Sequence, residues 1–297
     1  MNVPPDPPLL MTEILFDQAA GLRRLLAQSA LRTITVASAT PRCGRTLVTA
    51  NLAVALARRG HGVLLLDCAS GQGSAAALLG AQPRADLLLA ARGVADPGAL
   101  AAEGAAGVRV VQVRALAAAL EQSRSLDPAR LAQALDTLRE GADIVLVDAP
   151  PADLAWGSAS RELVLLVGPG AQAMTGSYRL IKRLQAGYRR QTIHILVTQP
   201  HSSTHADRIF GNLSATSRRF LNLPLASMGH ILNDEHVLRA AQLRQPVVEA
   251  FPDADCAQAL RACAETLSRC PHPGEDALAE FATRLVETAR TPAAAHH

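Results

Sequence analysis

The sequence predicts an α/β fold: a doubly wound, mostly parallel sheet flanked by helices, with a short helix at each end of the chain. From residue 33 onward, apolar runs of strand length alternate with stretches of helical spacing. Several runs are continuously apolar, which is typical of strands buried on both faces of a parallel sheet. The 297 residues are 49% apolar, which is enough for one large core with small appendages.

The chain divides into four segments. Residues 1–11 are proline-rich and predicted to be a disordered tail, and residues 12–30 have the spacing of a short amphipathic helix. Residues 31–270 contain the alternating pattern, and residues 271–297 form a tail with a last helix. The polar face of that helix is net acidic, which disfavours anionic lipid, so we expect its apolar face to pack on the domain.

The elements of the main domain follow in order. Strands are predicted at 33–38, 62–67, 108–113, 143–148, 162–167, 192–197 and 224–231. Helices are predicted at about 46–59, 127–140, 171–188, 203–221, 235–243 and 255–269. Ligands of such sheets bind beyond the carboxyl ends of the strands, so candidate site residues are sought there.

Composition excludes several classes of protein. No apolar run approaches the ~20 residues that span a bilayer, and the first residues lack the pattern of a signal peptide, so we expect a cytoplasmic protein. Peripheral attachment at the inner membrane or the cell pole stays open. The five cysteines have no paired short spacing, so neither a disulfide framework nor a structural metal site is predicted. The net charge of +3 gives no strong case for nucleic acid.

The stretch ATPRCGRT at 39–46 lies between a predicted strand and a predicted helix, where a phosphate loop of the form G-x-x-x-x-G-K-[ST] belongs. Gly44 allows a close turn around a phosphate, and Thr46 has the hydroxyl that would ligate Mg²⁺. The helix amino terminus offers unpaired N–H groups. Arg45 stands at the lysine position and keeps its charge but not its compact shape.

Two aspartates end predicted strands. Asp67 follows the run at 62–66 and Asp148 follows the run at 143–147. In nucleotide-binding proteins of the Walker type, such an aspartate helps to hold Mg²⁺. A single aspartate at a strand end would merely cap a loop. Two of them, together with the strand–loop–helix around Thr46, favour a nucleotide-binding fold.

Four further stretches carry a family resemblance. They are DQAAGLR (17–23), VTANLAVALARRGHGVLLLD (48–67), AMTGSYRLIKRL (173–184) and ILNDEHVLRAAQLRQPVVEAFPDADCAQAL (231–260). The first fits an element of the form DQAxxLR. With the loop at 39–46, these stretches resemble MinD/ParA-type proteins of the deviant Walker A class. Within that class, the chain is most similar to the flagellar-number regulators of the FlhG (FleN or YlxH) family.

The resemblance implies a function and a set of site residues. It implies ATP with Mg²⁺ as the cofactor, and an N-terminal helix that activates an FlhF-type signal-recognition GTPase. It also implies a flagellar C-ring protein or a flagellar transcription regulator as a further partner, and a second copy of the chain. The implied residues are Asp67 for water activation, Gly44, Arg45 and Thr46 for nucleotide, Thr46 and Asp148 for Mg²⁺, and Asp17, Gln18, Leu22 and Arg23 for the GTPase.

The chain also departs from the family pattern. In the loop, Thr40 stands at the position of the signature lysine, and Pro41 and Arg42 stand at the positions of two glycines. Ala69 replaces the second aspartate of the D-x-D motif, and Ala152 replaces the glycine of the motif that begins at Asp148. Thr198 replaces an asparagine that lies near the adenine in the family. Phosphoryl transfer depends on positioning and charge, so we predict a degenerate ATP site with weak or no hydrolysis.

Other functions are weighed against this prediction. The alternative of an active MinD/ParA-type ATPase switch, which dimerises on ATP at the membrane, is supported only by the intact Asp67, Thr46 and Asp148. A ParA-like DNA-associated protein would have to use the short basic pairs at 189–190 and 218–219, which solvated helix faces explain better. An amidotransferase-like ligase on the same fold has no distinct motif here.

Overall fold

The computed structural model describes residues 31–122, 126–187, 192–270 and 277–291. The chain separates into two units, Met1–Ala30 and Leu31–His297, and all described residues belong to the second. The predicted tail at 1–11, the predicted helix at 12–30 and its partner-binding residues Asp17, Gln18, Leu22 and Arg23 therefore lie outside the described residues.

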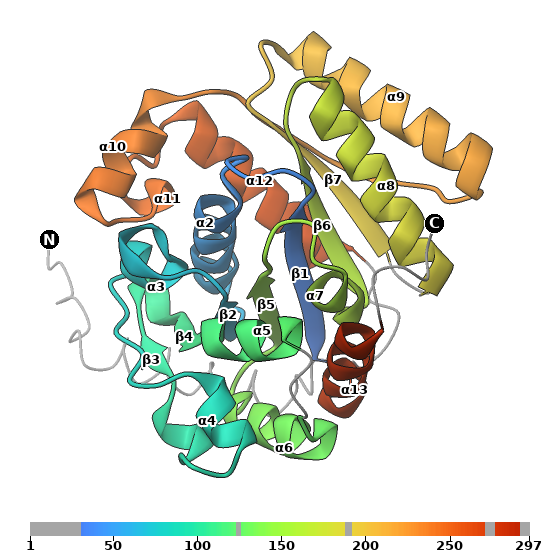
Figure 1. The fold of residues 1–297 in the computed structure, drawn as a ribbon. Helices are drawn as coiled ribbons and strands as arrows, with labels where there is room; N and C mark the ends of the chain where they lie inside the picture. Colours follow the sequence, from blue (N-terminus) through green and yellow to red (C-terminus); the bar gives the residue numbers. More distant parts are fainter. Residues whose placement is uncertain (1–30, 123–125, 188–191, 271–276, 292–297) are drawn as a thin grey trace, which may run out of the picture. The chain divides into compact units, whose positions relative to one another are not determined.

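The described strands form one eight-stranded sheet, in the order β3-β4-β2-β5-β1-β6-β7-β8 (Figure 1). Their bounds are β1 (Arg32–Ser38), β2 (Val63–Asp67), β3 (Ala102–Glu103), β4 (Arg109–Gln112), β5 (Ile144–Asp148), β6 (Glu162–Val167), β7 (Thr192–Thr198) and β8 (Ala226–Ile231). The pairings are parallel, except that β3 runs antiparallel to β4. The predicted doubly wound, mostly parallel sheet is confirmed, and the two-residue edge strand β3 was missed.

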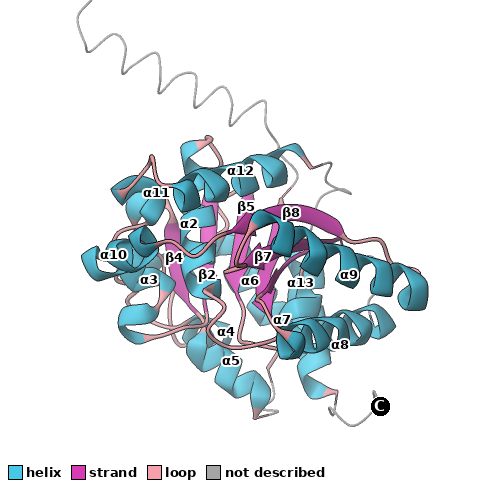
Figure 2. Ribbon diagram, turned by 90° about the horizontal axis from the view of Figure 1, so that it is seen from above, coloured by secondary structure: helices cyan, strands magenta, loops and turns pink. Residues whose placement is uncertain are grey.

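Helices cover both faces of the sheet (Figure 2). One face packs against α2 (Arg45–Arg58), α3 (Ala75–Leu78), α10 (Glu235–Leu243), α11 (Val247–Ala250) and α12 (Asp255–Arg269). The other packs against α4 (Leu87–Ala91), α5 (Arg114–Glu121), α6 (Pro128–Leu138), α7 (Leu154–Ala159), α8 (Ala171–Gly187), α9 (Ser203–Leu221) and α13 (Leu278–Arg290). Three short 3₁₀ turns lie in the connections, η1 (Gly71–Gly73), η2 (Pro97–Ala99) and η3 (Ala105–Gly107).

The six helices predicted for the main domain are present. The helices that the sequence did not predict are short: α3 and α11 have 4 residues, α4 has 5, α7 has 6 and α5 has 8. An apolar stripe needs about two turns before its period can be recognised, so these elements give no readable pattern.

The last helix packs on the domain, as expected. Leu278, Phe281 and Leu285 of α13 are buried in a cluster with residues of α6 and α7. The Oγ of Ser158 in α7 also donates a hydrogen bond to the Oγ1 of Thr288 in α13 at 3.2 Å. Among the described residues, no helix combines the length and the apolar character that crossing a membrane would require.

Candidate functional site

Three motifs that lie far apart in the sequence meet at the carboxyl edge of the sheet. Asp67 ends β2 and Asp148 ends β5, and the parallel register pairs these two residues directly. The neighbouring strand β1 ends at Ser38, and the loop 39–44 then leads into α2. This is the edge where doubly wound sheets bind their ligands.

The backbone is left-handed at three positions beside this edge. Gly44 has φ 78°, and Arg42, at a position where the family resemblance implies glycine, has φ 63°. Ala152, at a second such position, has φ 56°, and its amide donates to the carbonyl oxygen of Ser38 at 2.7 Å. Left-handed conformations are unfavourable for residues with a Cβ. The backbone therefore stays left-handed at Arg42 and Ala152, although both residues carry a Cβ that disfavours this conformation.

The amino terminus of α2 points its free donors toward this loop. Gly44 is the N-cap, no side chain caps the helix, and no acidic residue stands in its first turn. Within the described part of the chain, the backbone amides of Gly44, Arg45 and Thr46 have no hydrogen-bond acceptor. A helix end of this kind attracts anions through its N–H groups and its dipole.

The carboxylate of Asp148 is shared by two side chains of α2. Nε of Arg45 donates to Oδ1 at 2.6 Å, and Oγ1 of Thr46 donates to Oδ2 at 2.7 Å. Asp148 is fully buried. Burial raises the pKa of Asp148, while the charge of Arg45 and the hydrogen bonds from Thr46 and Arg45 oppose that shift. The predicted nucleotide and magnesium residues are thus brought together, but they bind one another.

Asp67 holds the loop that follows its own strand. Its Oδ1 accepts the amide of Ala69 at 2.9 Å and its Oδ2 accepts the amide of Ala76 at 2.8 Å. Burial raises the pKa of Asp67 to about 6, and the charge of Asp148 adds to the rise. In this arrangement the carboxylate anchors residues 68–76. The family resemblance implies that Asp67 activates a water molecule. That water would have to bind one of the two carboxylate oxygens that already accept these amides.

Sequence reasoning missed a residue that supports this loop. Nε2 of Gln112 donates to the carbonyl oxygens of Asp67, at 2.7 Å, and Ala69, at 2.6 Å. Nη1 of Arg114 then donates to Oγ of Ser70 at 2.7 Å. A glutamine at the end of an otherwise apolar strand is a signal that could have identified Gln112.

Two buried hydroxyls lie at the ends of strands on the same edge. Ser38 ends β1 and Thr198 ends β7, and both are almost fully buried. Neither hydroxyl oxygen has a hydrogen-bond partner among the described residues.

Gly176 of α8 approaches the loop at 39–44 closely, because a Cβ at that position would lie 3.2 Å from Cβ of Ala39. The AMTGSYRLIK segment thus packs directly on the phosphate loop.

Magnesium does not fit this arrangement of side chains. The two groups that would hold it, the hydroxyl of Thr46 and the carboxylate of Asp148, are bonded to each other, and the guanidinium of Arg45 already occupies the second carboxylate oxygen. A divalent cation would also meet the positive charge of Arg45. Elsewhere among the described residues, no cluster of three or more His, Cys, Asp or Glu side chains could hold a metal ion.

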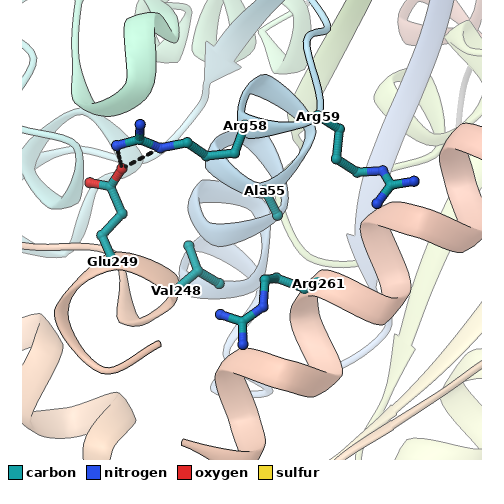
Figure 3. Close-up of a pocket in the computed structure, with 6 residues that line it drawn as sticks. All are labelled: Ala55, Arg58, Arg59, Val248, Glu249 and Arg261. Atoms are coloured by element: carbon teal, nitrogen blue, oxygen red, sulfur yellow. Dashed lines mark hydrogen bonds and ion pairs between the residues drawn. The ribbon is translucent and has the colours of Figure 1, made fainter. Parts of the chain in front are cut away.

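A separate pocket lies at the other end of α2, between α2, α11 and α12 (Figure 3). It has a volume of ≈ 450 Å³ and is lined by Ala55, Arg58, Arg59, Val248, Glu249 and Arg261. The guanidinium of Arg58 pairs with Glu249, and its Nε lies 3.0 Å from Oε1. Arg261 donates to the carbonyl oxygen of Pro252. The first contact attaches α11 to α2, and the second attaches α12 to the connection between α11 and α12, so we interpret the pocket as a packing seam.

Comparisons with known proteins identify the family of the chain. The family model described as the CobQ/CobB/MinD/ParA nucleotide binding domain matches residues 34–247. The chain is 30% identical to the antiactivator FleN of Pseudomonas aeruginosa over 257 residues, which are 84% of this chain and 92% of FleN.

Solved structures show the same fold. The cell division protein MinD of Aquifex aeolicus superposes with a TM-score of 0.63 at 17% identity, over 82% of this chain and 100% of that one. MinD of Pyrococcus horikoshii, solved with Mg-ADP, gives 0.62 at 19% identity, over 80% of this chain and 96% of that one. The family model, the FleN similarity and the eight-stranded sheet lead to one conclusion: the chain belongs to the CobQ/CobB/MinD/ParA nucleotide-binding family.

Proposed function

We propose that this protein is a regulator of flagellar number or placement, similar to FlhG, and that it acts mainly by binding partner proteins. The observation that carries the proposal is the 30% identity to the antiactivator FleN, which extends over 84% of the chain. The likeness also extends over 92% of FleN. The printed name, antiactivator, supports an activator as one partner, which the proposal takes to be a flagellar transcription regulator. The proposal adds a flagellar C-ring protein and a second copy of this chain as further partners.

The proposed nucleotide site is degenerate. Thr40 is neutral where the family has its signature lysine, and Arg45 pairs with Asp148. Removing a single donor that stabilises a transition state costs ~10²–10³ in rate, by analogy with oxyanion holes. Two such losses in one loop support weak or absent hydrolysis, with ATP as a bound ligand rather than a substrate.

The N-terminal helix is proposed to be the part that acts on the FlhF-type GTPase. Its residues Asp17, Gln18, Leu22 and Arg23 fit the DQAxxLR element, which lies ahead of the nucleotide-binding domain. In this proposal the protein works in the cytoplasm or at the inner membrane near the pole. Direct binding of nucleic acid is not part of the proposal, since the net charge is only +3.

The test is the GTPase rate of a purified FlhF-type protein in the presence of this full-length chain. We expect stimulation by the wild type and a loss of about tenfold or more with Gln18→Ala or Arg23→Ala, as for an interface residue worth over 1 kcal/mol. Arg24→Ala, one position beyond the DQAxxLR element, is the matched control and should still stimulate. A wild-type chain that leaves the GTPase rate unchanged would remove the partner from the proposal.

A further inference from the structure

The side chain of Arg45 occupies the place where a cation is needed. Its Nε lies 2.6 Å from Oδ1 of Asp148, while Thr46 takes Oδ2. In P-loop proteins the corresponding threonine and aspartate hold the magnesium ion. Thr49 completes the surroundings of the carboxylate, with its Oγ1 at 3.5 Å from Oδ1. The buried negative charge of Asp148 is therefore balanced by an arginine that belongs to the loop itself.

This arginine cannot easily give way to a metal ion. A guanidinium stays protonated at any ordinary pH, and moving it away would leave the buried carboxylate without its partner. The side chain of Arg45 is only 12% exposed and that of Asp148 is 0% exposed, so water cannot replace the lost contact. A lysine in the same position is a flexible point charge and would leave more freedom around the carboxylate.

Donors for phosphate oxygens remain beside this pair. The amides of Gly44, Arg45 and Thr46 lack acceptors within the described ranges, and α2 begins with no capping side chain. Nη1 and Nη2 of Arg45 likewise have no hydrogen-bond partner in the part of the chain that the structure describes. The planar fork of a guanidinium matches phosphate oxygens well, and here it is held in place through Nε.

We propose that this loop binds the phosphates of a nucleoside di- or triphosphate without a divalent metal ion, with Arg45 supplying the positive charge that Mg²⁺ supplies in other P-loop proteins. Nε of Arg45 stays on Asp148, and its terminal nitrogens and the α2 amides face the phosphates. The inference rests on the degenerate nucleotide site of the proposed function and specifies how that site recognises its ligand.

The experiment is a calorimetric titration of the full-length protein with ADP and with ATP, each in MgCl₂ and in EDTA. For the wild type we expect dissociation constants that agree within about threefold between the two conditions. Arg45→Ala should weaken binding at least tenfold. In Arg45→Lys we expect Mg²⁺ dependence to appear, with binding at least tenfold weaker in EDTA. Arg59→Ala, at the opposite end of α2, is the control and should bind as the wild type does.

Two results would overturn the inference. One is wild-type binding that is tenfold or more tighter with Mg²⁺, and the other is no binding of either nucleotide by protein whose circular dichroism shows it folded. The wild-type ratio decides the question even if Arg45→Lys fails to fold. GTPase stimulation by the same preparations, measured in MgCl₂ throughout, separates the two proposals, because it tests the N-terminal helix and not the metal dependence of the loop at 39–46.

Discussion

Ala152 adopts a backbone conformation that favours glycine. It is exposed, has φ 56° and donates its amide to Ser38. An L-residue in this conformation costs roughly 1–2 kcal/mol, whereas glycine adopts it freely but loses about 0.5–1 kcal/mol more in backbone entropy on folding. The local strain exceeds the entropy difference, so glycine should be the more stable residue at this position.

We therefore expect Ala152→Gly to raise the free energy of unfolding by roughly 0.5–1 kcal/mol, measured by urea denaturation. Ala118→Gly, inside α5, is the matched control and should lower it by about the same amount, because helical alanine is favoured over glycine. Equal destabilisation by both substitutions would show that the turn at Ala152 is not strained.

The site itself could be predicted only in part. The spacing around Gly44 and Thr46, together with aspartates after two apolar runs, was enough to place Asp67 and Asp148 at one edge of the sheet. The pairing of Arg45 with Asp148 was not predicted, because it joins residues 103 positions apart and depends on the rotamer of a long side chain. The two hydrogen bonds that Asp67 accepts from backbone amides were not predicted either, because they depend on the path of a loop that has no sequence pattern of its own.

At the scale of elements, α2 contacts α11 through one buried hydrogen bond and one exposed ion pair. Asn51 is buried: its Oδ1 accepts the amide of Val248 in α11 at 3.1 Å, and its Nδ2 donates to Leu47 at 2.9 Å. Arg58 pairs with Glu249 of the same short helix (Figure 3). The side chain of Arg58 is, however, 68% exposed. Both contacts join α2 to α11, but the Asn51 hydrogen bond is buried whereas the Arg58–Glu249 ion pair is exposed to water.

Asn51→Ala should lower the free energy of unfolding by about 1–3 kcal/mol, because it leaves the buried amide of Val248 without an acceptor. Glu249→Ala removes a solvent-exposed ion pair and should cost at most about 1 kcal/mol. Urea denaturation of both variants beside the wild type measures the difference. If Glu249→Ala proved the more costly change, the surface pair rather than the buried amide would be what holds α11.

Element length decided which parts of the fold the sequence predicted. The strands β1, β2, β5 and β6 are buried on both faces, so their apolar runs were visible without any knowledge of their neighbours. The four-residue helices α3 and α11 owe their conformation to contacts with α2 and the sheet rather than to their own periodicity. The edge strand β3 exists only through its antiparallel pairing with β4.

For the whole molecule, two buried carboxylates on different strands respond to pH in opposite ways. Asp67 ends β2, and Glu162 begins β6 in a bidentate pair with Arg32, whose Nη1 also donates to the carbonyl oxygen of Leu267 in α12. Burial raises the pKa of Asp67 from 3.8 to about 6. Burial would also raise the pKa of Glu162, but the nearby His194 ring and the guanidinium of Arg32 outweigh it and lower that pKa from 4.5 to about 2.

The signs of the two effects follow from which state holds the proton. Between about pH 4 and 6 the folded protein keeps a proton on Asp67 that the unfolded chain releases, so stability falls as the pH rises, by at most about 3 kcal/mol. Below about pH 4.5 the unfolded chain protonates Glu162 while the folded protein resists protonation until about pH 2. Stability therefore also falls as the pH drops through that range, by a similar amount.

We expect the free energy of unfolding to pass through a maximum between about pH 4 and 5, measured by urea denaturation from pH 3 to 7.5. Asp67→Asn removes one titrating group and should reduce the decline on the alkaline side; Asp148 and Asp153, whose pKa values burial also raises, account for decline that remains. Glu162→Gln should reduce the decline on the acid side, where Asp234 and Glu280 also have lowered pKa values, and should leave the alkaline side as it is. If the Asp67→Asn protein showed an unchanged slope between pH 4 and 6.5, the carboxyl group of Asp67 would have the same pKa in the folded and unfolded chains. The hydrogen bonds that it accepts from backbone amides would then fully offset the effect of its burial.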